Sequence, residues 1–249
     1  MTNNKKRKKN FVEVDIFKIL KSSGFTMDDL EQNQIKEAFR HIKRPLLKKV
    51  VESNVSDSIA NGNVIMIVSA HPEEGKTFVA SNLAASIAAE KDKAVLLIDA
   101  DVARSSVSQF FGIKAQYGFV EYLLGEKPNL ANLIIKTTKS NFEILPAGRR
   151  YKHSTELFSS EKTKQLMHEL ASQNKEKIII LDSPPLFAAS ESMALAELAG
   201  QIIVVVASGS NHKELKGALE FLDLSRVTGT VFNKSRSPSR PYYYGYADQ

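Results

Sequence analysis

The 249-residue sequence contains no cysteine and no tryptophan, and only 8% of its residues are aromatic. Without cysteine the chain can build neither a disulfide framework nor a thiolate metal site, and it has no thiol nucleophile. Its longest apolar runs, such as residues 202–207, are far too short to cross a bilayer. The opening residues MTNNKKRKKN have no apolar segment behind their charges, as a secretory signal would have. We therefore expect a cytoplasmic protein.

Positive charge is concentrated near the start of the sequence. The formal net charge is +6, and five positive charges come from the run KKRKK at residues 5–9, so the remainder is nearly neutral. We predict that residues 1–12 form a disordered basic arm, and we expect no nucleic-acid-binding face on the body. Two roles stay open for the arm. It is either a solubilising segment or a contact to an anionic membrane surface or acidic partner.

Residues 13–60 are predicted to form a helical segment followed by a linker. Thr26 and Asp29 have the spacing of a capping box at the start of a helix. Pro45 predicts a kink or an end of that helix near Arg44. The apolar residues that recur at helical spacing are Ile35, Phe39, Ile42 and Leu46. The stretch ESNVSDSIANGN that follows is typical of a linker or turn.

From residue 64 onward the sequence contains short apolar runs rich in β-branched residues. They are VIMIVS, AVLLIDAD, FEILPA, KIIILDS, QIIVVVAS and RVTGTVFN. Several are apolar almost throughout, which is typical of strands buried on both faces of a parallel sheet. Helical stretches such as TFVASNLAASIAAEK and TKQLMHELASQ lie between them. The alternation predicts a doubly wound, mostly parallel α/β domain over residues 61–235, with ligands at the carboxyl ends of its strands.

The first of these strands is followed directly by SAHPEEGKT, residues 69–77. A strand, then Gly-Lys-Thr, then a helix is the context of a phosphate-binding P-loop. The amides at the helix start would face phosphates, Lys76 would contact the β and γ oxygens, and the Thr77 hydroxyl would bind Mg²⁺. Two residues depart from the general motif, since Ala70 replaces its first glycine and Glu73 places an acid in an anion-binding loop. We predict a P-loop NTPase architecture that binds ATP and Mg²⁺.

Carboxylates at the ends of two later strands support a metal–nucleotide site. Asp99 and Asp101 end one strand and lie on the same side, because strand side chains alternate, and Asp182 ends another strand. Desolvating a charge is costly, so buried strand ends rarely carry a carboxylate without a role. Helix capping or an ion pair would explain either cluster alone. Together, behind a P-loop, they predict that Asp182 is the Walker-B carboxylate and that Thr77, Asp99 and Asp182 organise the metal.

These motifs resemble those of the bacterial tyrosine kinases, the P-loop autokinases of polysaccharide export systems, from about Glu37 to the end of the chain. The phosphate loop of that family reads Pro-Gly-Glu-Gly-Lys-Ser/Thr, which this chain matches except at Glu73. The family motif Asp-x-Asp followed by Arg is met by Asp99, Asp101 and Arg104, and a third motif is met by LDSPPL. The form DADVAR resembles the cytoplasmic subset found beside exosortase and exopolysaccharide genes.

The resemblance implies an ATP-dependent protein-tyrosine autokinase that regulates exopolysaccharide synthesis or export. The catalytic residues that it implies are Lys76, Asp99, Asp101, Arg104 and Asp182. The residues expected to hold the nucleotide are Pro72, Glu73, Glu74, Gly75, Lys76, Thr77, Phe78 and Asn233. Asn233 falls where relatives place an adenine-contacting side chain, although an ordinary turn asparagine would also explain it.

The resemblance also implies partners. Glu37, Arg40 and Lys43 fit the Glu-x-x-Arg-x-x-Arg oligomerisation helix of the family, with lysine for the last arginine. The resemblance therefore implies a homo-oligomer, such as a ring. A separate membrane protein of the chain-length-determinant, or polysaccharide co-polymerase, class is the expected partner. It would place this chain peripherally at the inner face of the plasma membrane. A tyrosine phosphatase is expected to reverse the modification.

The end of the chain, residues 236–249, gathers four of the seven tyrosines of the sequence, namely Tyr242, Tyr243, Tyr244 and Tyr246. Prolines and a glycine around them oppose regular structure, so we predict a flexible tail with exposed phenols. The resemblance makes these tyrosines phosphoacceptors, modified by a neighbouring subunit. The alternative is an adhesive tail or a strand packed on the body.

Two other functions stay open. A Min- or Par-type ATPase switch shares the fold and motifs, but it typically has a second lysine at the position of His71. A non-catalytic scaffold would result if Glu73 spoiled the anion cradle by its charge or by backbone strain. A eukaryotic-type kinase is disfavoured because the sequence has no GxGxxG loop, His-Arg-Asp or Asp-Phe-Gly motif.

Overall fold

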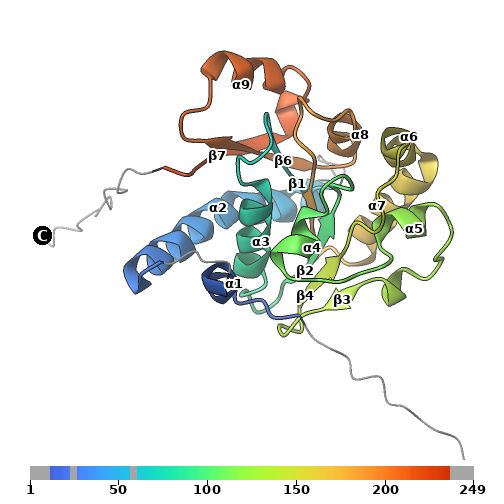
Figure 1. Ribbon diagram of the computed structural model, residues 1–249, viewed down its shortest axis with the longest axis horizontal. Helices are drawn as coiled ribbons and strands as arrows, with labels where there is room; N and C mark the ends of the chain where they lie inside the picture. The colour runs from blue at the N-terminus through green and yellow to red at the C-terminus, as the bar shows by residue number, and fades with distance from the viewer. Residues whose placement is uncertain (1–11, 23–26, 57–60, 236–249) are drawn as a thin grey trace, which may run out of the picture.

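The computed structural model describes residues 12–22, 27–56 and 61–235. The predicted basic arm, except Val12, and the predicted tyrosine tail lie outside these residues. In the described part a seven-stranded sheet has the order β3-β4-β2-β5-β1-β6-β7 (Figure 1). The strands are β1 (Val64–Ser69), β2 (Ala94–Asp99), β3 (Ile135–Lys136), β4 (Phe142–Leu145), β5 (Lys177–Asp182), β6 (Gln201–Ala207) and β7 (Val227–Asn233). Every pairing is parallel except β3 with β4, which confirms the predicted mostly parallel sheet.

Helices cover both faces of the sheet. They are α1 (Ile16–Ser22), α2 (Asp29–Ser56), α3 (Lys76–Ile87), α4 (Ser106–Phe110), α5 (Phe119–Leu123), α6 (Ser154–Ser159), α7 (Glu161–Gln173), α8 (Glu191–Ala196) and α9 (His212–Leu219). Short 3-10 turns lie at Leu130–Asn132 and Leu224–Arg226. The arrangement is the doubly wound α/β fold that the alternating sequence pattern predicts.

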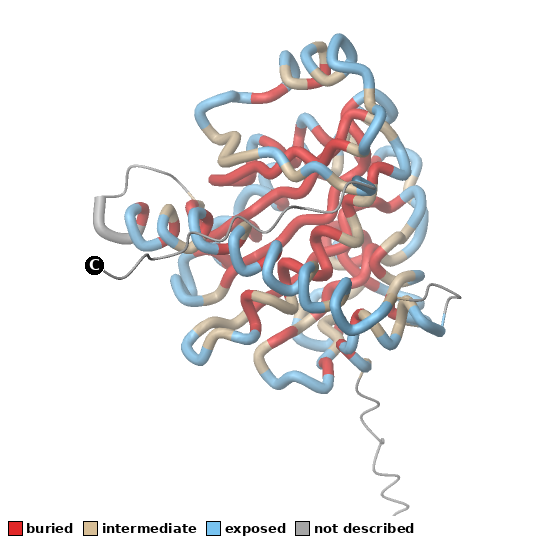
Figure 2. The backbone as a smooth tube through the Cα atoms, turned by 90° about the vertical axis from the view of Figure 1, so that its left-hand side faces the viewer, coloured by how far each residue is buried: buried red, intermediate tan, exposed pale blue. Residues whose placement is uncertain are grey.

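The central strands are buried on both faces, as their continuous apolar runs predict (Figure 2). Ile65 and Ile67 of β1 join a core with α2, α3 and α4. Val64, Met66 and Val68 of the same strand join the opposite core, with α5, α7 and α8. This alternation fixes the register of β1, because a one-residue shift would exchange the two cores.

The expectation that a helix ends near Arg44 because of Pro45 is wrong. Pro45 lies inside α2, which continues to Ser56. Pro45 is on the exposed side of the helix, where water can bind the carbonyl that proline leaves without a donor. The next turns are held by the fully buried Leu46 and by Val50, which pack in the core under α2. Tertiary packing therefore offsets a proline cost of about 3 kcal/mol.

The start of α2 also differs from the prediction. A reciprocal capping box joins Asp28 and Glu31: the Glu31 amide donates to Asp28 Oδ1 (2.7 Å) and the Asp28 amide donates to Glu31 Oε2 (3.1 Å). The predicted pair, Thr26 and Asp29, precedes the observed pair by two residues, and Thr26 lies outside the described residues. Both pairs have the right spacing, so spacing alone could not choose between them.

The N-terminal segment is attached to an edge of the sheet. Val12 forms a parallel bridge with Thr137, beside β3. Its amide donates to Lys136 O (3.3 Å), and its carbonyl accepts from the Thr138 amide (2.9 Å). The chain therefore enters the fold at the β3 edge and leaves its last strand, β7, at the other edge.

Candidate nucleotide-binding site

The loop between β1 and α3 lies at the carboxyl ends of the central strands. Gly75 precedes the first residue of α3 with a left-handed backbone, φ 99°. A cavity of about 360 Å³ opens against this loop. Its lining residues are Pro72, Glu73, Gly75, Lys76, Thr77, Asp101, Arg104, Ser106, Pro185 and Lys234. The predicted loop residues and the Asp-x-Asp motif thus meet at one site.

Glu74 holds the loop from inside. Its carboxylate is buried and accepts from the His71 amide (2.9 Å), the Ala207 amide (3.2 Å) and the Ser210 hydroxyl (2.6 Å). Burial raises the pKa of Glu74, but these hydrogen bonds outweigh it and keep the pKa below its ordinary value. The Glu74 side chain is therefore fully engaged in contacts within the protein.

Asn233, at the end of β7, also shapes the loop. Its Nδ2 donates to Glu74 O (2.9 Å). A Cβ on Gly75 would lie only 2.0 Å from that same nitrogen, so the close approach requires glycine. The amide nitrogen of Asn233 is therefore engaged with the loop, and its neighbour Lys234 lines the cavity. Sequence reasoning missed Lys234, because its only signal was its position next to Asn233.

Thr77 and Asp182 are joined at the base of the site. The Thr77 hydroxyl donates to Asp182 Oδ2 (2.6 Å). Burial raises the pKa of Asp182 to about 7, although the Thr77 hydroxyl and Lys76 act to lower it. Lys76 Nζ donates to the Ser69 hydroxyl (3.1 Å), and burial lowers the pKa of Lys76. Ser69 is a contact that the sequence did not single out.

The two acids of the Asp-x-Asp motif have different surroundings. Asp101 lines the cavity, and its Oδ1 accepts from the Arg104 amide (3.1 Å). Asp99 is fully buried behind it, in register with Asp182 on the neighbouring strand. Burial, and then the Asp182 carboxylate, raise the pKa of Asp99 well above its ordinary value. The prediction that both acids share one side therefore holds only in part, since Asp101 alone reaches the cavity.

The donor set fits a Mg²⁺ ion that is shared with a nucleotide. Asp99 Oδ1 and Asp182 Oδ1 are buried and have no hydrogen-bond partner in the described structure. The residues described contain no cluster of three or more acids and histidines arranged as a metal cage. Mg²⁺ is usually held by one or two carboxylates, water and substrate phosphates rather than by such a cage. Thr77 and Asp182 are the groups best placed to hold it.

Other predicted residues lie elsewhere. Phe78 points away from the cavity and packs edge-on against Phe39 of α2, with ring centroids 6.2 Å apart. Glu37 and Arg40 form an ion pair on the exposed side of α2. Lys43 is buried, donates to Ser86 O at the end of α3 (2.9 Å) and pairs with Glu90. Within one chain, the last cation of the predicted oligomerisation motif therefore anchors α2 on α3.

A loop that ends in glycine between a buried strand and a helix, with a lysine and a hydroxyl–carboxylate pair at its base, defines a P-loop nucleotide-binding domain. Residues 62–234 match the family model described as AAA domain. The chain is 32% identical over 190 residues to the tyrosine-protein kinase YwqD of Bacillus subtilis (strain 168), covering 74% of this chain and 78% of YwqD. It belongs to the bacterial tyrosine-protein kinase family.

Other comparisons agree. The chain is 31% identical over 230 residues to the tyrosine-protein kinase etk of Escherichia coli (strain K12), covering 91% of this chain but only 30% of that protein. The solved structure of the kinase domain of the Escherichia coli tyrosine kinase ETK matches with a TM-score of 0.68 at 30% identity, covering 85% of this chain and 80% of that one. The septum site-determining protein MinD of Pyrococcus horikoshii matches at 22% identity with a TM-score of 0.56, over 68% of each chain, which reports the fold alone. Among the helices described here, none is both long and apolar enough to span a membrane.

Proposed function

We propose that this chain is the catalytic unit of a Mg²⁺–ATP-dependent protein-tyrosine autokinase. The observation that carries the proposal is the group formed by Lys76, Thr77 and Asp182 at the P-loop, in a chain from a tyrosine-kinase family. The loop amides and Lys76 would bind the β- and γ-phosphates. Mg²⁺, held by Thr77 and Asp182, would neutralise phosphate charge when bound. Asp99 would support Asp182 from behind, and Arg104 would stabilise charge at the rim of the cavity.

The proton acceptor that we assign is Asp101. A tyrosine phenol has a pKa near 10, so a carboxylate within hydrogen-bond reach helps to remove its proton as the oxygen attacks phosphorus. Asp101 is the one acid of its motif that lines the cavity, whereas Asp99 is buried with a raised pKa. Positioning and charge stabilisation supply the rest of catalysis in phosphoryl transfer.

The acceptors that we propose are Tyr242, Tyr243, Tyr244 and Tyr246 of a neighbouring copy. The oligomer would use Glu37 and Arg40, which are exposed on α2. Through a membrane partner of the polysaccharide co-polymerase class and a tyrosine phosphatase, the cycle would regulate exopolysaccharide synthesis. These assignments rest on the family to which the chain belongs.

Intact-mass spectrometry after incubation with Mg²⁺–ATP tests the proposal. We expect phosphoryl additions that map to the tail tyrosines and that disappear in Lys76→Met. A chain with the four tail tyrosines replaced by phenylalanine is the matched control, because its nucleotide site is unchanged. If the starting protein is demonstrably unphosphorylated, gains no phosphoryl groups and yet hydrolyses ATP, the ATPase switch is favoured instead. Absence of nucleotide binding would favour the scaffold.

A further inference from the structure

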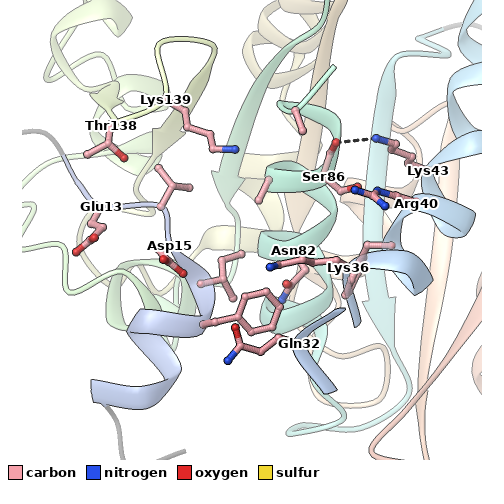
Figure 3. Close-up of a pocket in the computed structure, with 16 residues that line it drawn as sticks. Glu13, Asp15, Gln32, Lys36, Arg40, Lys43, Asn82, Ser86, Thr138 and Lys139 are labelled. Atoms are coloured by element: carbon pink, nitrogen blue, oxygen red, sulfur yellow. Dashed lines mark hydrogen bonds between the residues drawn. The ribbon is translucent and has the colours of Figure 1, made fainter. Parts of the chain in front are cut away.

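A second large cavity of the described structure lies away from the nucleotide site. It has a volume of about 580 Å³ and is enclosed by α1, the first half of α2, the last half of α3 and the turn between β3 and β4 (Figure 3). This size is within the range of small-molecule and side-chain binding sites. The cavity is at the amino ends of the strands, opposite the P-loop, because it contacts the end of α3 and the residues that precede β4.

The lining of this cavity contains more cationic side chains than carboxylates. Lys36, Arg40, Lys43 and Lys139 face two carboxylates, Glu13 and Asp15. Glu13 already pairs with Lys18, and Asp15 Oδ1 accepts from the Lys18 amide (3.1 Å) at the start of α1. Arg40 and Lys43 have their own acidic partners outside the cavity. Lys36 and Lys139 have no carboxylate partner among the described residues. The cavity therefore favours an anion.

The remaining lining suits a flat ring. Phe39 is buried at one side of the cavity, and the Phe17 ring lies 5.2 Å from Lys36 Nζ, in a cation–π contact. Asn82 of α3 and Gln32 of α2 add polar amides, and Asn82 is 6% exposed. In Figure 3, Lys139 on one side faces Lys36 and Arg40 on the other. A phosphate between these cations would leave room for an attached ring against the phenylalanines.

We propose that this cavity binds a phosphotyrosine side chain from the tail of a second copy of the protein. The inference rests on the proposed function, which makes phosphotyrosine in the tail, and adds a site that reads this product. A phosphate monoester carries about −1.5 to −2 charges, which matches the cation surplus better than an unmodified phenol does. The described chain finishes after β7, which lies at the opposite edge of the sheet from β3. The end of β7 and the β3–β4 turn also lie at opposite ends of the strands. This separation favours a tail from a second copy as the ligand.

The probe is a synthetic peptide of residues 240–249 with phosphate on Tyr243, labelled for fluorescence polarisation. Binding to the full chain is measured with Mg²⁺–ADP present, so that the P-loop does not compete for phosphate. We expect the phosphopeptide to bind at least about tenfold tighter than the unmodified peptide, since charge-assisted hydrogen bonds are the strong ones. Lys139→Glu and Lys36→Glu should each remove at least that factor. Lys136→Glu is the matched control, because Lys136 is an exposed lysine of the same β3–β4 hairpin outside the cavity, and should change affinity less than about twofold.

Lys36 and Lys139 are exposed, so their replacement leaves the core unchanged. Equal affinity for modified and unmodified peptides would overturn the proposal, and so would equal effects of Lys139→Glu and Lys136→Glu. AMP is the competitor that tests the other source of phosphate. If AMP displaces the phosphopeptide, and Lys36→Glu and Lys139→Glu weaken AMP binding as well, the proposal of a phosphotyrosine ligand is overturned and the cavity is assigned to a free nucleotide. The peptide is synthetic, so none of these results depends on the kinase activity of the chain, which the mass measurement tests separately.

Discussion

Arg104 Nη1 lies 3.8 Å from Glu73 Oε1, and both residues line the mouth of the nucleotide cavity. The two side chains are 51% and 81% exposed, so their attraction adds little to stability. Glu73 has a left-handed backbone, φ 65°, in a loop whose amides should face phosphate. We expect the Glu73 carboxylate to compete with a nucleotide phosphate for Arg104 and to repel that phosphate.

We predict that Glu73→Gly raises nucleotide affinity by about three- to tenfold, because it removes both the charge and the strained backbone of a non-glycine residue. Glu73→Gln separates the two causes, since it keeps the backbone strain and should give only the charge part of the gain. Calorimetric titration with Mg²⁺–ADP at two salt concentrations checks this. A gain in Glu73→Gln that does not shrink at high salt would contradict an electrostatic cause.

Lys43 and Arg40 should differ sharply in their effect on stability. Lys43→Ala leaves the Ser86 carbonyl without its donor and Glu90 without its partner, so we expect a loss of about 1–3 kcal/mol in the free energy of unfolding. Arg40→Ala removes an exposed ion pair and should cost less than about 1 kcal/mol. Urea titration measures both. Equal losses would mean that Lys43 does not anchor α2 on α3.

Without metal or nucleotide, the stability of the chain should depend on pH through the titration of Asp182. The pKa of Asp182 in the folded chain is raised to about 7 from an ordinary value of 3.8. Its favourable contribution to the free energy of unfolding is therefore complete below pH 3.8 and is lost as the pH rises towards 7. Asp182→Asn should therefore gain stability relative to the natural chain between about pH 5 and 7, by at most about 1.4 kcal/mol per pH unit. Thermal unfolding in EDTA across this range is the measurement.

Asp223→Asn is the control for that series. Hydrogen bonds from Ser225 lower the pKa of Asp223, so its stabilising effect is lost only as pH falls below its ordinary range. The difference between Asp223→Asn and the natural chain should stay flat from pH 5 to 7. A flat result for Asp182→Asn as well would show that Asp182 is ionised throughout this range.

Gly75→Ala should abolish nucleotide binding. A Cβ at this position meets Asn233 Nδ2 at 2.0 Å, and the backbone has a φ of 99° that alanine rarely adopts. Gly75→Ala combined with Asn233→Ala removes the clash but not the strain, so partial recovery of affinity is expected. Fluorescent-nucleotide titration of the two single variants and the double variant measures the coupling. Purely additive losses would mean that Asn233 and Gly75 act independently.

Patterns with a strong local cause were predictable from the sequence. Continuous apolar runs located the long parallel strands, and Gly-Lys-Thr after the first strand located the P-loop. β3 has only two residues, Ile135 and Lys136, so it has no periodicity to detect. Pro45 did not end its helix, because helix propensity decides little where neighbours such as Leu46 are fully buried.

Residue roles that depend on tertiary packing were not predictable. Phe78 follows the P-loop threonine in sequence, yet helical rotation turns it towards Phe39 instead of the cavity. Asp99 and Asp101 look equivalent in the motif, but the chain leaves the sheet after Asp99, so one acid is buried and the other lines the cavity. The use of Glu74 as an internal anchor needs Ala207 and Ser210, which are more than a hundred residues away.

The bridge between Val12 and Thr137 has a consequence for how copies of the chain meet. Because it brings the N-terminal segment onto the β3 edge, the described chain begins at one lateral end of the sheet and finishes at the other, after β7 (Figure 1). The two edges of the sheet therefore present different surfaces. If each copy gave the segment after β7 to the next copy without receiving one back from it, the copies would meet head to tail, through different surfaces, and repeated contacts of that kind either close into a ring or grow as a filament.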